Sequence, residues 1–144
     1  FPFTEEDAVE WISNKQSDPR GYSFGIFLKP DLELIGQVGL LEIEWDNRLA
    51  ELGFFLGKDY WGCGYVTEAA ERVVDFGFGE MSLNRIGAHH LSWNAASGRV
   101  LMKLGMTREG TLRQRIKKND VYEDIVVYGI LAQDYSGGSR SAEQ

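Results

Sequence analysis

The sequence predicts one domain of the mixed α/β (α+β) class, and three observations predict it. The chain has 144 residues, of which 43% are hydrophobic and 26% charged, so it can bury one core but has no room for a second independent domain. Some segments alternate apolar and polar residues as strands do, and others repeat apolar residues at helical spacing. Residues 49–91 read as the strand, helix and strand of a parallel connection.

The first part of the chain is expected to form a helix and a hairpin. Thr4, followed by three acidic residues, is a good helix start, and apolar residues then recur on one helical face until the helix ends near 17–19. Residues 22–29 and 32–44 are apolar segments separated by a Pro-Asp turn. We expect these two segments to pair as antiparallel strands.

The middle of the chain is expected to run from a strand through a glycine-rich loop into a helix. Residues 49–56 form a strand whose even-numbered residues are apolar, so Glu51 points to the opposite face. The loop over 57–65 leads into a helix over 66–79, where apolar residues have helical spacing. A strand over 84–91 follows.

The last part is expected to form a short helix and a second hairpin. Asn94 caps a helix that runs through Lys103, and Gly105 suits the left-handed residue that ends it. Strands over 107–117 and 121–131 flank an Asn-Asp turn. The element order is therefore αβββαβαββ over residues 1–135, before a loose Gly- and Ser-rich tail over 136–144.

Charge and cysteine content narrow the class of function. Fifteen Lys and Arg residues against 22 Asp and Glu residues leave a net charge of −7, which argues against nucleic acid and anionic membranes and favours cationic partners such as protonated amines. Cys63 is the only cysteine, so the chain has no disulfide framework and no thiolate-rich zinc site. The sequence also has no apolar run of about 18 residues. We expect a cytoplasmic protein that binds neither membrane nor nucleic acid.

The glycine-rich loop is a candidate anion site. Gly62 and Gly64 stand directly before a helix, where free backbone N–H groups and the positive end of the helix dipole can hold a pyrophosphate. The loop lacks the Gly-Lys-Ser/Thr of a Walker loop and the third glycine of a dinucleotide fingerprint, so ATP and NAD are poor ligands for it. A tight strand-to-helix turn without a ligand is the alternative.

Three segments of the sequence together resemble one family. The segments 51–70 (ELGFFLGKDYWGCGYVTEAA), 93–110 (WNAASGRVLMKLGMTREG) and 122–131 (YEDIVVYGIL) look like the GNAT superfamily of N-acetyltransferases. They look most like the branch that acetylates ribosomal-protein alanine or serine N-termini, to which spermidine acetyltransferases are related. The resemblance implies a mostly antiparallel central sheet with helices on both faces, from which the family's first strand and helix are missing ahead of Phe1.

The resemblance also implies a reaction and its partners. GNAT enzymes transfer acetyl from acetyl-CoA, as co-substrate and without a metal, to a primary amine by direct attack in a ternary complex. The acceptor would be a protein N-terminus, a polyamine or an amino sugar, and a homodimer is in keeping with the family. Two departures, Asp59 where the family has Gln or Arg and Leu101 where many members have a tyrosine acid, favour the alternative of a noncatalytic acyl-CoA-binding or regulatory module.

The match carries the family's cofactor roles to particular positions. The loop and helix start would hold the pyrophosphate, the strand before the loop would bond the pantetheine arm, and Asn94 would contact that arm or act as a plain helix cap. Two of the loop's aromatic residues would cover the cofactor or pack. The cofactor-binding candidates are Phe54, Phe55, Leu56, Trp61, Gly62, Cys63, Gly64, Tyr65, Thr67 and Asn94.

Two residues are the candidate catalytic groups. An amine of pKa near 10 is protonated at neutral pH and must lose a proton before it attacks, and Glu51 is the candidate base, directly or through water. A solvent-exposed strand carboxylate is the alternative reading. Ser97, which matches a serine in the N-terminal acetyltransferase branch, would protonate or solvate the thiolate, or would only partner the Asn94 cap. The thiolate could also leave with help from water alone.

Other reactive residues have simpler interpretations. Cys63 near a helix start could form an acetyl-enzyme, but the family transfers acetyl directly. His89 and His90 alternate faces of a strand, so one could look toward the site, although packed or surface positions are commoner. The basic residues from 113 to 118 are better read as a solvated hairpin edge than as an RNA site.

Overall fold

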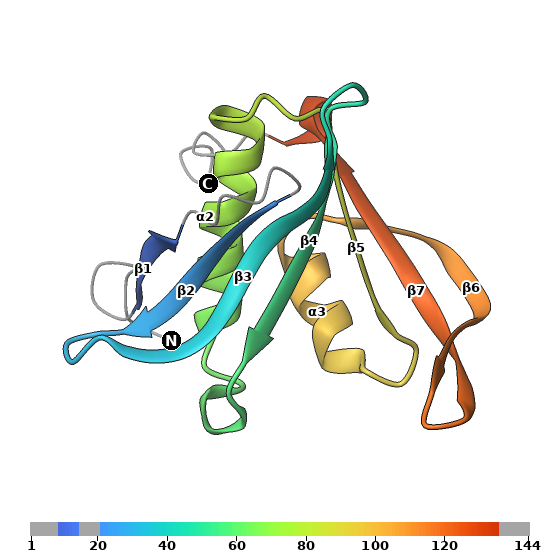
Figure 1. The fold of residues 1–144 in the computed structure, drawn as a ribbon, viewed down its shortest axis with the longest axis horizontal. Helices are drawn as coiled ribbons and strands as arrows, with labels where there is room; N and C mark the ends of the chain where they lie inside the picture. The colour runs from blue at the N-terminus through green and yellow to red at the C-terminus, as the bar shows by residue number, and fades with distance from the viewer. Residues whose placement is uncertain (1–8, 15–20, 136–144) are drawn as a thin grey trace.

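The computed structural model describes residues 9–14 and 21–135, which form a seven-stranded sheet and two α-helices (Figure 1). The strand order is β1-β2-β3-β4-β5-β7-β6, and every neighbouring pair in it is antiparallel except β4 with β5. The elements are β1 (Val9–Asn14), β2 (Tyr22–Leu28), β3 (Glu33–Glu44), β4 (Leu49–Leu56), α2 (Tyr65–Gly79), β5 (Arg85–Leu91), α3 (Ala95–Lys103), β6 (Thr107–Lys118) and β7 (Val121–Leu131), with short 3₁₀ turns η1 (Lys58–Tyr60) and η2 (Ala132–Asp134).

Both expected hairpins are present. β2 pairs with β3 and β6 pairs with β7, each antiparallel and within one or two residues of the expected boundaries. The turn between β6 and β7 consists of Asn119 and Asp120, whose φ angles are 53° and 64°. Two successive positive φ angles give the turn type whose twist matches a hairpin, which is why the Asn-Asp pair occupies it.

The parallel connection runs through β4, α2 and β5, as the sequence predicts. β4 and β5 pair only at Leu49–Arg85, Ala50–Ile86 and Glu51–Gly87, although both strands continue beyond these pairs. Figure 1 shows the two strands separating toward their carboxyl ends. The sheet therefore opens between them after Glu51.

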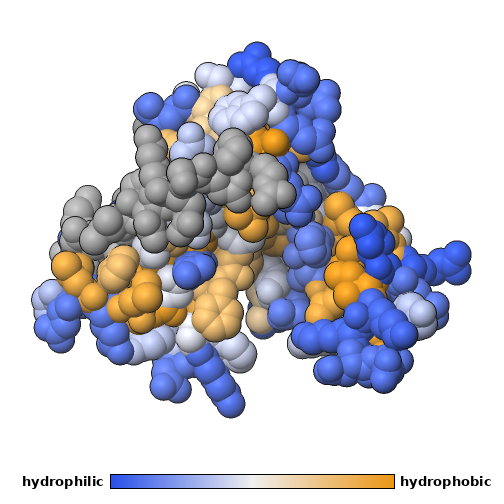
Figure 2. Space-filling model, in the orientation of Figure 1, coloured by the Kyte–Doolittle hydropathy of each residue, from blue (hydrophilic) through white to orange (hydrophobic). Residues whose placement is uncertain are grey.

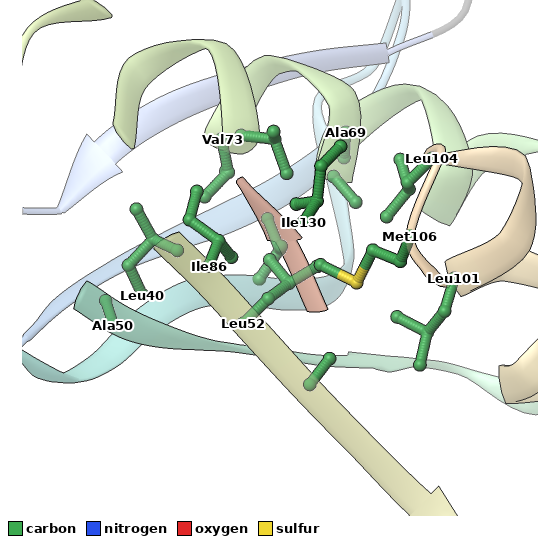
Figure 3. Close-up of a cluster of buried hydrophobic side chains, with 14 of the residues drawn as sticks. Leu40, Ala50, Leu52, Ala69, Val73, Ile86, Leu101, Leu104, Met106 and Ile130 are labelled. Carbon is green, nitrogen blue, oxygen red and sulfur yellow. The ribbon is translucent and has the colours of Figure 1, made fainter. Parts of the chain in front are cut away.

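The core lies between the sheet and the two helices (Figure 3). Gly77 of α2 lies close to Ile86, and Gly98 of α3 lies close to His90, and these two β5 residues share one face of the sheet. Both described helices therefore cover the same face. Side chains such as Leu40, Ile86 and Leu101 are almost fully buried there, and each stabilises the fold by roughly 1.5–3 kcal/mol. These observations confirm the α/β (α+β) class; a helix on the opposite face is not among the described residues.

The helix expected near the N-terminus is wrong for residues 9–14, which form strand β1 instead. The backbone of β1 pairs with β2, with Trp11 opposite Ile26. The helical spacing of apolar residues is a weak local signal, whereas β2 offers a full row of backbone hydrogen bonds to a segment that contains Val, Trp and Ile. Residues 4–8, 15–20 and the tail over 136–144, on which other expectations rest, lie outside the described residues.

The surface in Figure 2 carries its hydrophobic residues in separate groups rather than in one continuous area. The exposed large apolar side chains come from distant places, such as Leu34 on β3 and Val121 on β7. No helix in the described ranges is both long and apolar enough to cross a membrane.

Candidate active site

The opening between β4 and β5 exposes main-chain groups of β4. The N–H of Gly57 donates to the main-chain oxygen of Ile35 at 2.8 Å. In an antiparallel ladder, residues that bond to one neighbour alternate with residues whose main-chain groups face the other side. Odd-numbered residues of β4 therefore bond to β3, and the main-chain groups of Phe54 and Leu56 face the opening. A ligand arm that carries amides could add to this edge as a further strand does.

Phe55 has a different environment. By the same alternation its main chain bonds to β3, opposite Gln37, and its side chain is 69% exposed. Of the three expected pantetheine positions, the structure thus turns the backbones of Phe54 and Leu56 toward the opening and leaves Phe55 with its ring in solvent.

The glycine-rich loop has the geometry of an anion site. Gly62 and Gly64 have φ angles of 79° and 84°, a region that side chains disfavour, and Gly64 is the N-cap of α2 without any side-chain cap. Among the described residues, no group accepts a hydrogen bond from the N–H of Gly62, Cys63, Gly64, Val66 or Thr67. Several donors therefore converge at the positive end of a 15-residue helix, where a phosphate group is stabilised.

The aromatic residues of the loop are held by hydrogen bonds. Trp61 is 62% exposed, and its indole Nε1 donates to the main-chain oxygen of Leu56 at 2.8 Å. The hydroxyl of Tyr60 donates to Glu33 at 2.7 Å, and this bond to a carboxylate raises the pKa of Tyr60. Asp59, which directly precedes Tyr60 on η1, is exposed. The half-buried Cys63 thiol donates to the main-chain oxygen of Trp61 at 3.8 Å.

Asn94 begins α3 and faces its first turn. Its Oδ1 accepts a hydrogen bond from the N–H of Ser97 at 3.3 Å, so the predicted N-cap is confirmed. Within the part of the chain that the structure describes, neither the Asn94 amide nitrogen nor the Ser97 hydroxyl has a partner. Both remain able to contact a ligand. Leu101, farther along α3, is 1% exposed in the core, so the helix offers no acid at that position.

Glu51 lies on the sheet face opposite the helices and pairs with a histidine. Its Oε2 is 2.7 Å from Nδ1 of His89, and the two side chains are 35% and 46% exposed. Glu51 is opposite Gly87, the last residue of β5 that pairs with β4, and His89 lies two residues farther along on the same face. The pair therefore stands where the sheet opens.

A second ion pair adjoins this one. Arg85 bonds Glu109 through both terminal nitrogens, at 2.9 and 2.7 Å. This pairing lowers the pKa of Glu109 and raises that of Arg85, which also feels the charge of Glu51. Glu109 thus bonds the Arg85 guanidinium, while the Glu51 carboxylate bonds His89.

His90 belongs to the core rather than to the opening. It is 8% exposed, with Nδ1 2.7 Å from the main-chain oxygen of Leu91 and Nε2 3.2 Å from the hydroxyl of Tyr128. Since a carbonyl only accepts, Nδ1 carries the proton and Nε2 accepts from Tyr128. Of the two adjacent histidines, only His89 thus reaches a candidate catalytic residue.

Sequence reasoning missed the pairing of His89 with Glu51 and that of Arg85 with Glu109. The alternation along β5 could have placed Arg85 and His89 on one face, but choosing the Glu51 side required the register with β4. The expected hairpin edge is confirmed, since β6 is an edge strand and Arg113, Arg115, Lys117 and Lys118 on it are exposed. In residues 9–14 and 21–135, no three acidic, His or Cys side chains are grouped to hold a metal ion.

Residues 1–107 match the family model described as the acetyltransferase (GNAT) domain, so this chain belongs to the GNAT family of N-acetyltransferases. GNAT acetyltransferases use acetyl-CoA as co-substrate.

Curated relatives agree with this assignment. The chain is 32% identical over 140 residues to the uncharacterized N-acetyltransferase p20 of Bacillus licheniformis, covering 94% of this chain and 79% of the relative. It is 44% identical over 114 residues to the probable N-acetyltransferase YjcK of Bacillus subtilis, covering 78% and 63%. It is 29% identical over 129 residues to the ribosomal-protein-serine acetyltransferase of Escherichia coli, covering 89% and 72%. The expected resemblance to the ribosomal branch is confirmed.

Solved structures share the fold. A spermidine N-acetyltransferase from Vibrio cholerae, described as a dodecamer in an intermediate state, superposes with a TM-score of 0.77 at 26% identity, covering 85% of this chain and 71% of that one. A GNAT-family acetyltransferase from Bacillus anthracis superposes with a TM-score of 0.72 at 32% identity, covering 77% and 66%.

Proposed function

We propose that this protein transfers the acetyl group of acetyl-CoA to a primary amine by direct attack in a ternary complex. One observation carries the proposal: the unpartnered amides of the loop around Gly62 and Gly64 lie at the end of a strand whose neighbouring edge is open. A diphosphate followed by an amide-bearing arm matches these two features in order. The acetyl group would then lie toward the start of the opening.

The proposed cofactor site uses main-chain groups for most contacts. Phe54 and Leu56 would bond the pantetheine arm, and the loop amides with the first turn of α2 would bind the pyrophosphate. Trp61 and Tyr65 would cover the cofactor, and the free amide nitrogen of Asn94 would reach the arm. Asp59 is exposed on η1, so its carboxylate can turn to solvent, away from a phosphate.

Glu51 is the proposed proton acceptor for the amine, directly or through water. It is only partly exposed and lies at the start of the opening, where the reacting centre would be. A positioned base typically contributes about 10²- to 10⁴-fold in rate. Ser97 is the proposed group that protonates or solvates the departing thiolate, a role that its unpartnered hydroxyl allows.

The acceptor is proposed to be a protein N-terminal amine or a small amine such as a polyamine or amino sugar. The net charge of −7 attracts any of these cations. The relatives include enzymes named for ribosomal-protein serine and for spermidine, so proteins similar to this one are named for both kinds of acceptor.

A noncatalytic acyl-CoA-binding module is the second candidate, and the buried Leu101 in place of a tyrosine acid favours it. Thiol release from acetyl-CoA, measured with N-terminal peptides, polyamines and aminoglycosides, separates the two. We expect turnover with at least one amine and a loss of about 10²-fold or more in Glu51→Gln. Stabilisation of the protein by CoA without turnover of any acceptor would favour the binding module. Glu80→Gln, an exposed carboxylate beyond α2, is the matched control.

A further inference from the structure

The contact between Glu51 and His89 assigns a proton to one nitrogen of the imidazole. Nδ1 of His89 is 2.7 Å from Oε2 of Glu51, and an ionised carboxylate only accepts hydrogen bonds. Nδ1 therefore carries a proton, and in the neutral ring Nε2 holds a lone pair. Among the described residues no group bonds to Nε2, and the side chain is 46% exposed. The imidazole is thus held at one nitrogen and available at the other.

The two groups differ in how well they suit proton removal at neutral pH. As a class, carboxylates are weaker bases than imidazoles, and imidazole is the side-chain group whose charge changes most readily around neutral pH. A general base works best when its pKa lies near the operating pH. A carboxylate bonded to Nδ1 also stabilises the imidazolium that forms when Nε2 takes a proton.

His89 also stands in the right part of the fold. β5 leaves β4 after Gly87, and His89 is two residues beyond that point on the same face as Glu51. The charged groups that face it are Glu51 from β4 and Arg85 from β5, the latter bonded to Glu109 of β6. β7 places Val127 opposite His89 and adds no charge there.

We propose that His89 is a catalytic residue that removes the proton from the acceptor amine at Nε2, and that Glu51 is the positioning residue that holds Nδ1–H toward itself. This assignment rests on the proposed acetyl transfer and revises one step of it: the imidazole takes the proton, and Glu51 acts through the imidazole rather than directly or through water.

The proton balance is simple. The acceptor enters as an ammonium, Nε2 takes one proton, and the freed amine forms the C–N bond with the thioester carbonyl carbon. The C–S bond breaks and sulfur leaves with the electron pair. The nitrogen loses its second proton as the amide forms. Of the two protons, one ends on the CoA sulfur and the other passes to solvent, and no oxidant or further reactant is needed.

Kinetics with a small amine of pKa near 10 test the proposal, because ionisation of such an acceptor stays clear of the imidazole range. We expect wild-type kcat/KM to fall at acidic pH, since protonated imidazole cannot act as a base. The kcat/KM of His89→Asn should not show this fall at acidic pH. At pH 7.5 it should be about 10²-fold or more below that of the wild type. The variant should keep its affinity for CoA and its Tm. Added imidazole should restore part of the rate in His89→Gly.

A readout apart from activity follows the tautomer. Nitrogen-15 NMR of the imidazole should show the proton on Nδ1 in the wild type and an increased Nε2–H fraction in Glu51→Gln. The double variant should be little slower than the slower single variant, because the pair acts as a unit.

Each outcome decides between the claims. If the wild type turns over an amine while His89→Asn keeps the full rate and the same fall at acidic pH, His89 is not the base and only this inference fails. If His89→Asn is slow but Glu51→Gln leaves tautomer and rate unchanged, the positioning role fails. If the wild type acetylates no amine, the proposed function itself fails.

Discussion

The indole nitrogen of Trp61 donates a hydrogen bond to the main-chain oxygen of Leu56, at 2.8 Å, and this oxygen faces the opening between β4 and β5. An amide of the pantetheine arm that bonds to the end of β4 would compete for the same acceptor. Trp61 therefore occupies, at the end of β4, a main-chain acceptor that the proposed cofactor arm would need.

Trp61→Phe should bind CoA more tightly, by up to about fivefold, because one hydrogen bond of about 1 kcal/mol no longer has to be displaced while an aromatic ring remains. Isothermal titration calorimetry measures the affinity. CoA should also change the tryptophan emission of the wild type more than that of the variant. A weaker affinity in Trp61→Phe would show that the indole N–H serves the complex rather than the empty site.

Gly64→Ala should weaken both the fold and CoA binding. The φ of 84° at Gly64 costs an alanine about 1–2 kcal/mol, although an added methyl group would meet no atom within 4 Å. The expected Tm loss is about 3 °C per kcal/mol. Gly79→Ala is the matched control, since that glycine also has open space but no positive φ and ends α2. Equal CoA affinity in both variants would contradict the role of the Gly64 backbone.

Substitutions of Asn94 should separate its two roles. Asn94→Ala removes the cap and should cost about 1 kcal/mol of unfolding free energy together with CoA affinity. Asn94→Ser keeps a good capping side chain but lacks the amide nitrogen, so its stability should stay near wild type while CoA binding weakens. Urea unfolding and calorimetry measure the two effects. If Asn94→Ser bound CoA as the wild type does, the residue would be a cap alone.

Glu109→Gln should reduce stability in a pH-dependent way. Arg85 lowers the pKa of Glu109 in the folded protein, so the pair's contribution is fully present above the unfolded-state pKa of about 4.3 and is lost as the pH falls through the lower folded value. The pair is exposed, which limits its contribution to about 1 kcal/mol or less. Urea unfolding should show the variant weaker at pH 7 and the difference shrinking below about pH 4. A difference that is constant with pH would exclude the ion pair as its cause.

Sequence patterns predict well the elements whose ends are marked by nearby residues such as glycines and cap residues. The alternation over 49–56, the glycines before α2 and the Asn94 cap all lie where the sequence places them. These patterns depend on neighbours a few residues away, which the sequence displays directly.

The remaining features depend on pairings between distant segments. β1 is a strand because its backbone pairs with β2, and the local sequence of residues 9–14 does not predict this pairing. The bond between Glu51 and His89 joins residues 38 positions apart and depends on a register that pairs only three residues of β4 with β5. The opening between those strands, on which the proposed function depends, arises from the way β4 and β5 pair in the sheet and is not visible in either strand's sequence.

The most direct measurement is a backbone amide NMR titration with acetyl-CoA, and with a CoA fragment that lacks the diphosphate as control. The amides of Gly62, Cys63, Gly64, Val66 and Thr67 should shift strongly with acetyl-CoA and little with the fragment, because a diphosphate would be their acceptor. Saturating acetyl-CoA that leaves these five resonances in place would contradict the account.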